Sequence, residues 1–144
     1  MKQKTKTYEM PNMGCLLGIA YQTEYASLEA TLKSEGLEIS APEYLVLRVI
    51  FNHEGLQLCE IGEILGKDKG AISRCVGSLV RKQLVRTESV SHKCLRAYTS
   101  SKGEELKPKI LNVAVMRQSE LAKKLSKDEM QQLKIILTKI INPK

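Results

Sequence analysis

The spacing of apolar residues changes and then reverts along this chain, and that change constrains the fold more than any other feature. Up to about residue 82 the apolar residues recur at the spacing of helices. Two segments, LVRTESV (84–90) and KCLRAYT (93–99), then alternate apolar and polar residues, as half-buried strands do. Helical spacing returns from residue 100. The pattern therefore predicts one hairpin, with the polar tip Ser91–His92, inside an otherwise helical chain.

Capping residues and glycines divide the helical part of the chain. Helices are expected over about 13–34, 41–54, 58–65, 69–81, 101–125 and 127–141. The spacing of a capping box occurs three times, at Ser40 with Glu43, Ser101 with Glu104 and Ser126 with Glu129. Asp68 can cap the helix that follows it. Pro108 lies inside a helical segment, so a kink or break is expected near Lys107.

The order of these elements predicts the fold class. The middle part reads helix–helix–helix–hairpin, which is the pattern of a winged helix-turn-helix. We expect a single domain over 1–144, mainly α with a small β-hairpin wing, in which 40–99 form the DNA-binding lobe. The outer segments, 1–36 and 100–144, carry apolar stripes larger than one small lobe can cover. They are expected to be dimerisation helices of a homodimer, although packing back onto the same chain remains open.

Composition excludes several classes of protein. No apolar run approaches the roughly 18 residues that span a bilayer, and no apolar signal segment opens the chain, so a cytoplasmic protein without a membrane partner is predicted. The 4 cysteines and 2 histidines have no zinc-ligand spacing, so no metal or other cofactor is expected and most thiols are interpreted as packed core residues. No histidine is paired with a serine or cysteine nucleophile, and we predict that the protein is not an enzyme.

Positive charge is concentrated in one stretch. Residues 66–96 hold 8 basic and 2 acidic side chains, a balance of +6, whereas residues 1–65 hold 5 and 9, a balance of −4. A concentrated basic patch favours a polyanionic partner, because each cation placed on a phosphate releases condensed counterions. A solvated, lysine-rich surface explains the charge alone equally well.

The stretch GKDKGAISRCVGSLVRKQLVR (66–86) combines that charge with a helical stripe. Its apolar residues Ile72, Cys75, Val76 and Leu79 share one face. The opposite face holds small and cationic residues, namely Lys69, Gly70, Ser73, Arg74, Gly77, Ser78 and Arg81. Small residues let a helix approach base edges, while cations reach guanine acceptors or phosphates. This combination predicts a recognition helix for the major groove of double-stranded DNA.

This stretch allows two other interpretations. GEILGKD resembles a phosphate-binding loop, but the spacing is one residue short, Asp68 replaces the hydroxyl residue, and a helix rather than a strand precedes it. Winged helices also serve as protein-interaction modules, in which case the basic helix would be a solvated surface. That second alternative stays open.

Nearly the whole chain resembles the MarR family of winged-helix transcription regulators, best over 40–106. LCEIGEILGKDKGAISRCVGSLVRKQLV is similar to the helix-turn-helix of that family, and TSSKGEEL to the Thr-x-Lys-Gly opening of its dimer-side helix, with Ser100 in the Thr position. The resemblance implies a homodimer with interlocked terminal helices, a pseudo-palindromic operator, and a repressor released by a small aromatic or anionic ligand. Its implied DNA-binding residues are Lys67, Lys69, Gly70, Ala71, Ser73, Arg74, Ser78, Arg81, His92 and Lys93.

The chain departs from the family pattern in three places: the wing, the residue after the recognition helix and the first helix of the motif. The wing of the family carries Asp-x-Arg, whereas this chain has Ser91, His92 and Lys93 there. Lys93 can still meet a phosphate, but the acidic brace for a minor-groove arginine is missing. Gln83 stands where a glycine usually follows the recognition helix, and Gly62 stands where alanine is common.

Two kinds of sensing site are suggested by the first helix. Cys15 resembles the reactive cysteine of the peroxide-sensing branch of the family, which makes a thiol-based redox regulator an alternative function; a packed thiol is the other interpretation. Tyr21, Tyr25, Tyr44 and Tyr98 could line a ligand cleft between the dimer helices and the DNA-binding lobe. Core packing explains these tyrosines equally well.

Overall fold

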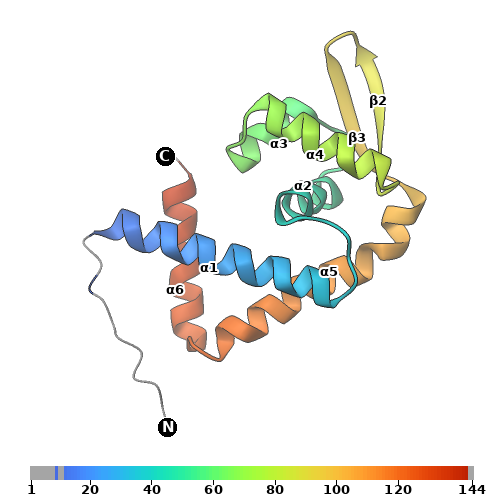
Figure 1. The fold of residues 1–144 in the computed structure, drawn as a ribbon. Coiled ribbons are helices and arrows are strands. Elements are labelled where there is room, and N and C mark those ends of the chain that lie inside the picture. The colour runs from blue at the N-terminus through green and yellow to red at the C-terminus, as the bar shows by residue number, and fades with distance from the viewer. Residues whose placement is uncertain (1–8, 10–11, 143–144) are drawn as a thin grey trace.

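The computed structural model describes residues 9 and 12–142 and confirms a mainly helical chain with a small antiparallel wing (Figure 1). Its elements, in chain order, are α1 (Met13–Ser34), α2 (Ala41–Asn52), β1 (Leu56–Gln57), α3 (Leu58–Leu65), α4 (Lys69–Arg81), β2 (Val85–Ser91), β3 (Cys94–Thr99), α5 (Ser101–Ala122) and α6 (Lys127–Ile141).

The sheet contains a strand that the sequence pattern did not indicate. Its strand order is β1-β3-β2, and β1 pairs with β3 through Leu56 opposite Ala97. A strand of two residues is too short to show alternation. The hairpin turn lies at His92–Lys93, one residue later than expected, because a register shift between Ser89 and Ser91 lengthens β2.

Helix α2 lies at the centre of the fold, between the α3–α4 pair and the long helices α1 and α5 (Figure 1). Its wide apolar face is buried as its spacing predicts, and Leu47 and Ile50 are fully enclosed. Ile61 of α3, Ile72 of α4, Leu32 of α1, and Ile110 and Val113 of α5 join the same core. This continuous core supports α4 from behind and leaves its other face outward.

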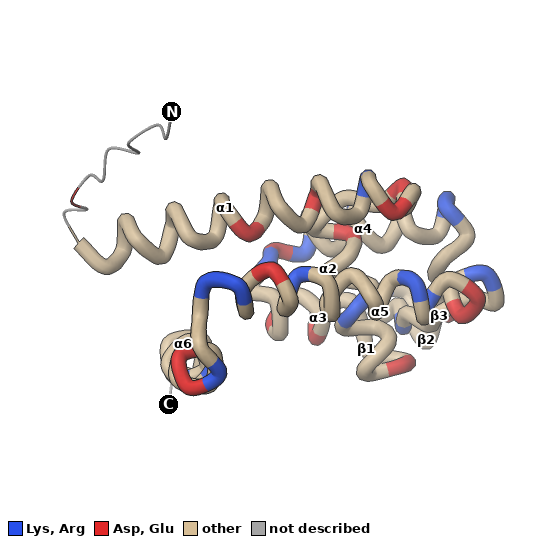
Figure 2. Tube along the Cα trace, turned by 90° about the horizontal axis from the view of Figure 1, so that it is seen from below, with Lys and Arg blue, Asp and Glu red and all other residues tan. Residues whose placement is uncertain are grey.

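The chain ends form a second part of the fold with much exposed apolar surface. The helices α1 and α6 overlap in the view of Figure 1, whereas Figure 2 shows them apart, with no charged residue over the first half of α1. No residue of α6 is buried. The large exposed apolar residues of these two helices are Met13, Leu16, Leu17, Ile19, Tyr21, Leu133, Ile135, Ile136, Leu137, Ile140 and Ile141.

Several local expectations need correction. The N-cap of α5 is Ser100, which accepts a hydrogen bond from Gly103 N, rather than Ser101. Helix α5 is not broken at Pro108 but changes direction along its length (Figure 1). The interpretation of most thiols as packed core residues is wrong for the single chain, because the structure leaves two cysteines exposed and two half-buried.

Across the described residues, the structure contains no helix that combines the length and the apolar character needed to cross a membrane.

Candidate nucleic-acid interface

A tight turn joins α3 to α4 and sets the start of the recognition helix. Lys67 N donates to Gly62 O at 2.9 Å, and Gly66 takes the left-handed conformation with φ 63°. A Cβ at position 62 would lie 2.8 Å from Lys67 O, closer than such atoms approach. The glycine that departs from the family pattern is therefore required by the close approach of these two backbone segments.

Helix α4 begins and packs as its sequence predicts. Asp68 is the N-cap, and its Oδ1 accepts from Ala71 N at 2.8 Å. Ile72, Val76 and Leu79 are buried against the lobe, while Cys75 is half-buried. Burial raises the pKa of the Cys75 thiol, and the nearby Glu43 carboxylate raises it further, so this cysteine is held in its neutral form.

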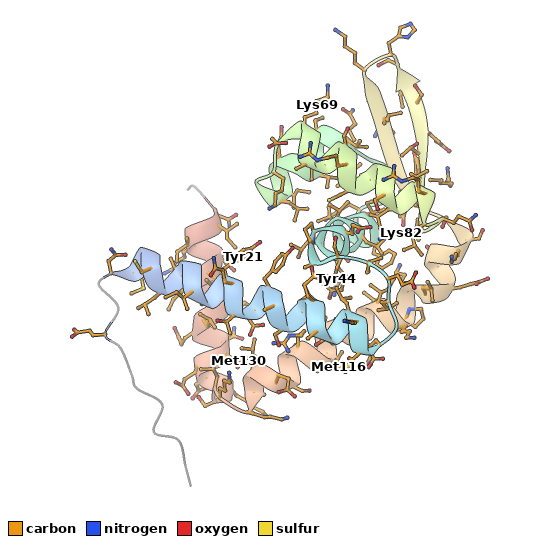
Figure 3. The ribbon with its side chains drawn as sticks, viewed as in Figure 1. Tyr21, Tyr44, Lys69, Lys82, Met116 and Met130 are labelled. Atoms are coloured by element: carbon orange, nitrogen blue, oxygen red, sulfur yellow. The ribbon has the colours of Figure 1, made fainter. Side chains whose placement is uncertain are left out.

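The outward face of α4 carries most of the predicted DNA-binding residues. Lys69 lies on the outer surface of the helix (Figure 3). The other exposed members of the set on this element and the preceding turn are Lys67, Gly70, Ser73, Arg74 and Arg81, whereas Ala71 is half-buried. The turn and the helix thus bring six of the ten predicted residues onto one accessible surface.

Two arginines of this face lie folded back over glycines. A Cβ at Gly70 would be 3.2 Å from Arg74 Nη1, and a Cβ at Gly77 would be 3.6 Å from Arg81 Nη1. Each guanidinium therefore occupies the space that a larger side chain four residues earlier would fill. The face stays thin while it keeps two long cationic side chains within reach of a groove.

Most cations of this surface are not used in internal ion pairs. Among the described residues, the acidic partners lie elsewhere: Lys82 pairs with Glu43, Arg86 with Glu88, Arg117 with Glu24 and Lys123 with Glu120. Lys67, Lys69, Arg74, Arg81 and Lys93 have no ion pair within that part of the chain. Their positive charge is available to an external polyanion.

Ser78 lies differently from its expected outward position. Its side chain is half-buried, and its Oγ donates to Glu43 Oε2 at 3.0 Å. The hydroxyl is thus engaged inside the protein. Sequence spacing placed Ser78 on the outward face of α4, and this expectation is wrong because a carboxylate 35 residues away in the chain holds its hydroxyl inside the protein.

The tip of the wing exposes Ser91 together with the two residues of the turn. His92 and Lys93 are exposed in the turn. The arginines nearer the base are occupied, since the Arg86 guanidinium lies 4.4 Å from the centre of the Tyr98 ring and Arg96 Nη1 donates to Gly55 O at 2.8 Å. These contacts brace the hairpin against the lobe and leave Lys93 as its outermost permanent cation.

A second candidate site lies between the two parts of the fold. Three of the four predicted tyrosines, Tyr21, Tyr25 and Tyr44, line a cleft of about 1150 Å³ between α1, α2, α5 and α6. The fourth, Tyr98, lies in β3 of the wing, where its ring contacts the Arg86 guanidinium, and is not part of this cleft. The Tyr21 and Tyr25 rings are 5.9 Å apart, and Tyr44 Oη accepts from Arg48 Nη1 at 3.0 Å. Burial raises the pKa of Tyr25, and the nearby Glu29 carboxylate raises it further.

The polar centre of that cleft was not found from the sequence. Arg117 Nη2 lies 3.1 Å from Glu24 Oε2, and both residues line the cleft. The Nε atom of Arg117 is buried without a hydrogen-bond partner in the described part of the chain. The two residues are 93 positions apart, and no sequence pattern links them.

Cys15 lies exposed in the first turn of α1, where its backbone N–H donates to Asn12 Oδ1 at 2.9 Å. Accessibility and a helix N-terminus are two of the conditions for a reactive thiol. The redox hypothesis stays a prediction. No group of three or more His, Cys, Asp or Glu side chains within the described residues could hold a metal ion.

Comparison with known proteins places these features in context. Residues 39–89 match the sequence profile described as the MarR family, and no curated protein sequence matches the chain. Wild-type MarR (apo form) from E. coli is 25% identical, with a TM-score of 0.75 and coverage of 93% of this chain and 100% of that one. The S. aureus MepR in its DNA complex is 19% identical, with a TM-score of 0.80 and coverage of 92% of this chain and 97% of that one. CouR from Rhodococcus jostii RHA1, bound to p-coumaroyl-CoA, is 17% identical, with a TM-score of 0.81 and coverage of 92% of this chain and 94% of that one.

Proposed function

We propose that this chain, which has the fold of the MarR family as its motifs indicate, is a sequence-specific double-stranded DNA-binding transcription regulator. We propose further that it is a homodimeric repressor released by a small ligand. The observation that carries the DNA-binding role is the outward face of α4, where exposed cations without internal ion pairs stand beside glycines and a serine. If these cations faced the interior, or were paired with acidic side chains of the protein, α4 could not bind DNA in this way.

The similar solved structures support this assignment without fixing its details. MepR, whose fold this chain shares with a TM-score of 0.80, is seen in complex with DNA. In a winged helix that enters the major groove with its recognition helix, the N-terminal residues of that helix meet base edges. Lys69, Gly70, Ser73 and Arg74 are the corresponding candidates here. Arg81, Lys67, His92 and Lys93 are the candidates for phosphate contacts.

The exposed apolar residues of α1 and α6 support a homodimer. Both helices leave large aliphatic side chains in solvent, including Ile136 at 50% exposure and Ile140 at 56%. A second copy related by a twofold axis would cover the same residues on both chains. Two symmetric recognition helices imply an operator of two related half-sites, that is, a pseudo-palindrome.

The tyrosine cleft supports a ligand that combines an aromatic or apolar part with an anionic part. Its walls carry Tyr21, Tyr25 and Tyr44 together with Arg117. CouR, which shares the fold, is bound to p-coumaroyl-CoA. A ligand in this cleft would contact both the dimer helices and α2, and so could bias the placement of the DNA-binding lobe.

A salt series of gel-shift titrations tests DNA binding. The probe is a duplex that the protein selects from a random library. The logarithm of affinity should fall linearly with the logarithm of salt concentration, by about 0.9 for each phosphate contacted. Absence of duplex retention even at low salt would contradict the proposal and favour the protein-interaction alternative.

Arg74→Ala tests the recognition face directly. If Arg74 contacts a base, the substitution should cost about 1–3 kcal/mol of binding to the selected duplex and relax the sequence preference at one position. Lys124→Ala, an exposed lysine in the turn before α6, removes the same charge far from α4 and is the matched control. Equal losses for the two variants would remove Arg74 from the set of base-reading residues.

A further inference from the structure

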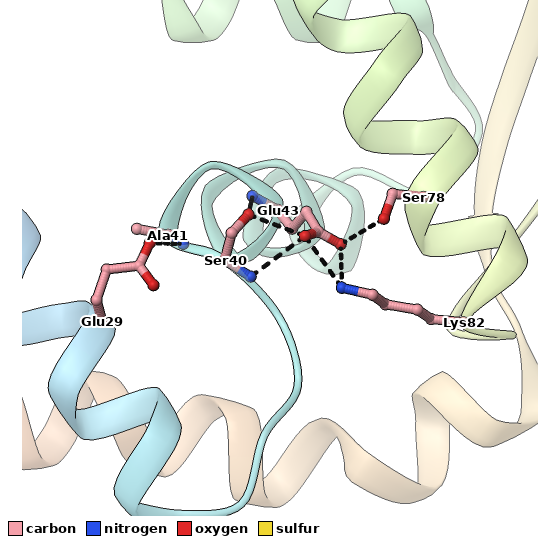
Figure 4. Close-up of polar contacts among 6 residues, drawn as sticks. All are labelled: Glu29, Ser40, Ala41, Glu43, Ser78 and Lys82. Atoms are coloured by element: carbon pink, nitrogen blue, oxygen red, sulfur yellow. Dashed lines mark hydrogen bonds and ion pairs between the residues drawn. The ribbon is translucent and has the colours of Figure 1, made fainter.

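A single buried carboxylate joins the start of α2 to the end of α4. Glu43, in the first turn of α2, is 8% exposed. Its oxygens accept from Ser40 Oγ at 2.9 Å, from Ser78 Oγ at 3.0 Å and from Lys82 Nζ at 2.9 and 3.1 Å (Figure 4). Ser40 is the N-cap of α2, whereas Ser78 and Lys82 lie in the last turn and at the C-cap of α4.

The electrostatics of both helix ends favour this arrangement. A carboxylate is stabilised at the N-terminus of a helix and an ammonium group at a C-terminus. Burial by itself raises the pKa of Glu43, but the hydrogen bonds from Lys82, Ser40 and Ser78 outweigh that effect and lower it below its ordinary value. The group is therefore an anion that needs its partners, since a buried charge without them is strongly unfavourable.

The same end of α2 is tied to α1. Glu29 Oε1 accepts from Ala41 N at 2.6 Å, and so satisfies a backbone donor in the first turn of α2 (Figure 4). Polar contacts thus run from α1 through the start of α2 to the end of α4. This line of contacts connects α4 to the long helix α1, in addition to the apolar core that lies behind α4.

We propose that Glu43 is a positioning residue for DNA recognition, which fixes the angle of α4 by holding Ser78 and Lys82. This inference rests on the proposed DNA-binding function. Glu43 itself would touch no DNA, because it lies beneath the far end of α4. Twelve residues separate Lys69 from Arg81, or about 18 Å along the helix. A tilt of about 5° about the anchored end would move the other end by about 1.5 Å, which is enough to break hydrogen bonds to bases.

A merely structural carboxylate would behave differently. Its removal would lower thermal stability and reduce the amount of active protein, so binding to every duplex would fall by the same factor. A positioning residue acts on the alignment of base contacts instead. Phosphate contacts from flexible lysines tolerate a small tilt, so affinity for unrelated DNA should be retained.

The test compares two duplexes at one salt concentration: the duplex selected from a random library by the wild-type protein, and a shuffled duplex of the same length. Glu43→Gln and Lys82→Met should each lower the ratio of the two affinities about tenfold, the effect of losing one good base contact. Glu38→Gln is the matched control, because it makes the same charge change at an exposed position close to Glu43 in the chain.

Circular dichroism at the assay temperature establishes that each variant is folded. Should Glu43→Gln fail to fold, Lys82→Met decides the question alone, since the Lys82 side chain is 36% exposed and its truncation leaves the core intact. The double variant should lower the ratio no further than either single variant, because both break one contact.

An unchanged affinity ratio in the folded variants, or equal losses on both duplexes, would overturn the role of Glu43 and leave the proposed function standing. Failure of the wild-type protein to bind either duplex would overturn the proposed function, and the role of Glu43 with it.

Discussion

At the scale of single residues, close backbone contacts decide which positions tolerate no side chain. Gly103 lies in the first turn of α5, against the segment that leaves α4. A Cβ built there would come within 2.2 Å of Leu84 O and 2.7 Å of Thr99 Cγ2. The glycine of TSSKGEEL therefore has a packing role, because it lets α5 start directly against the base of the wing.

Gly103→Ala should lower the free energy of unfolding by about 3 kcal/mol, since the backbone of Leu84 must move to admit the methyl group. Urea denaturation followed by circular dichroism measures this change. Gly77→Ala is a suitable control, because its Cβ would meet only Arg81 Nη1 at an ordinary 3.6 Å and alanine favours a helix. Equal stability of the two variants would contradict the steric explanation.

Gln83 shows another residue-scale effect that the sequence only hinted at. Its φ is 63°, in the left-handed region that favours glycine. The chain reverses direction here so that Leu84 N can reach Leu79 O at 3.0 Å. Because this chain has glutamine where the family usually has glycine, the backbone at Gln83 is strained, which lowers the free energy of unfolding by about 1 kcal/mol.

At the scale of elements, the pH dependence of stability should report the link between α2 and α4. The pKa of Glu43 is lowered in the folded protein from its ordinary 4.5. Its contribution to stability is therefore complete above that value and is lost as pH falls through the lower, folded pKa. Urea unfolding of wild type and Glu43→Gln over a pH series measures it.

The difference in unfolding free energy between those two proteins should be constant at neutral pH and should shrink as the pH falls below 4.5, because the folded-state pKa of Glu43 lies below that value. Glu38→Gln, at an exposed position, provides the reference for a general change in charge. A difference that stays constant down to acidic pH would show that the Glu43 carboxylate gains nothing from Lys82 and its other partners.

Sequence patterns predicted the positions of helices and strands better than they predicted contacts between distant residues. Helical stripes, caps and the alternation of the hairpin depend on neighbouring residues, so α1, α2, α4 and the wing could be placed from the sequence. Strand β1 was missed because two residues carry no period. The hydrogen bond from Ser78 to Glu43 and the ion pair of Arg117 with Glu24 were missed, because the two residues of each contact lie far apart in the chain.

At the scale of the whole molecule, the exposed apolar residues of α1 and α6 are the surface on which the proposed homodimer depends. Ile136→Glu should weaken the proposed dimer about a hundredfold, because twofold symmetry removes about 1.5 kcal/mol of apolar burial twice. Analytical ultracentrifugation over a concentration series measures the dissociation constant. Gln132→Glu adds the same charge at an exposed polar position of α6 and should leave that constant nearly unchanged.

The arginines folded over Gly70 and Gly77 have a consequence for the length of DNA that one subunit can read. Arg74 and Arg81 are seven residues apart, so their Cα atoms are separated by about 10 Å of helical rise. Stacked base pairs repeat every 3.4 Å or so, and this separation corresponds to about three steps of the double helix. We therefore expect α4 to contact each half-site over about three to four base pairs, from a base at Arg74 to a phosphate at Arg81.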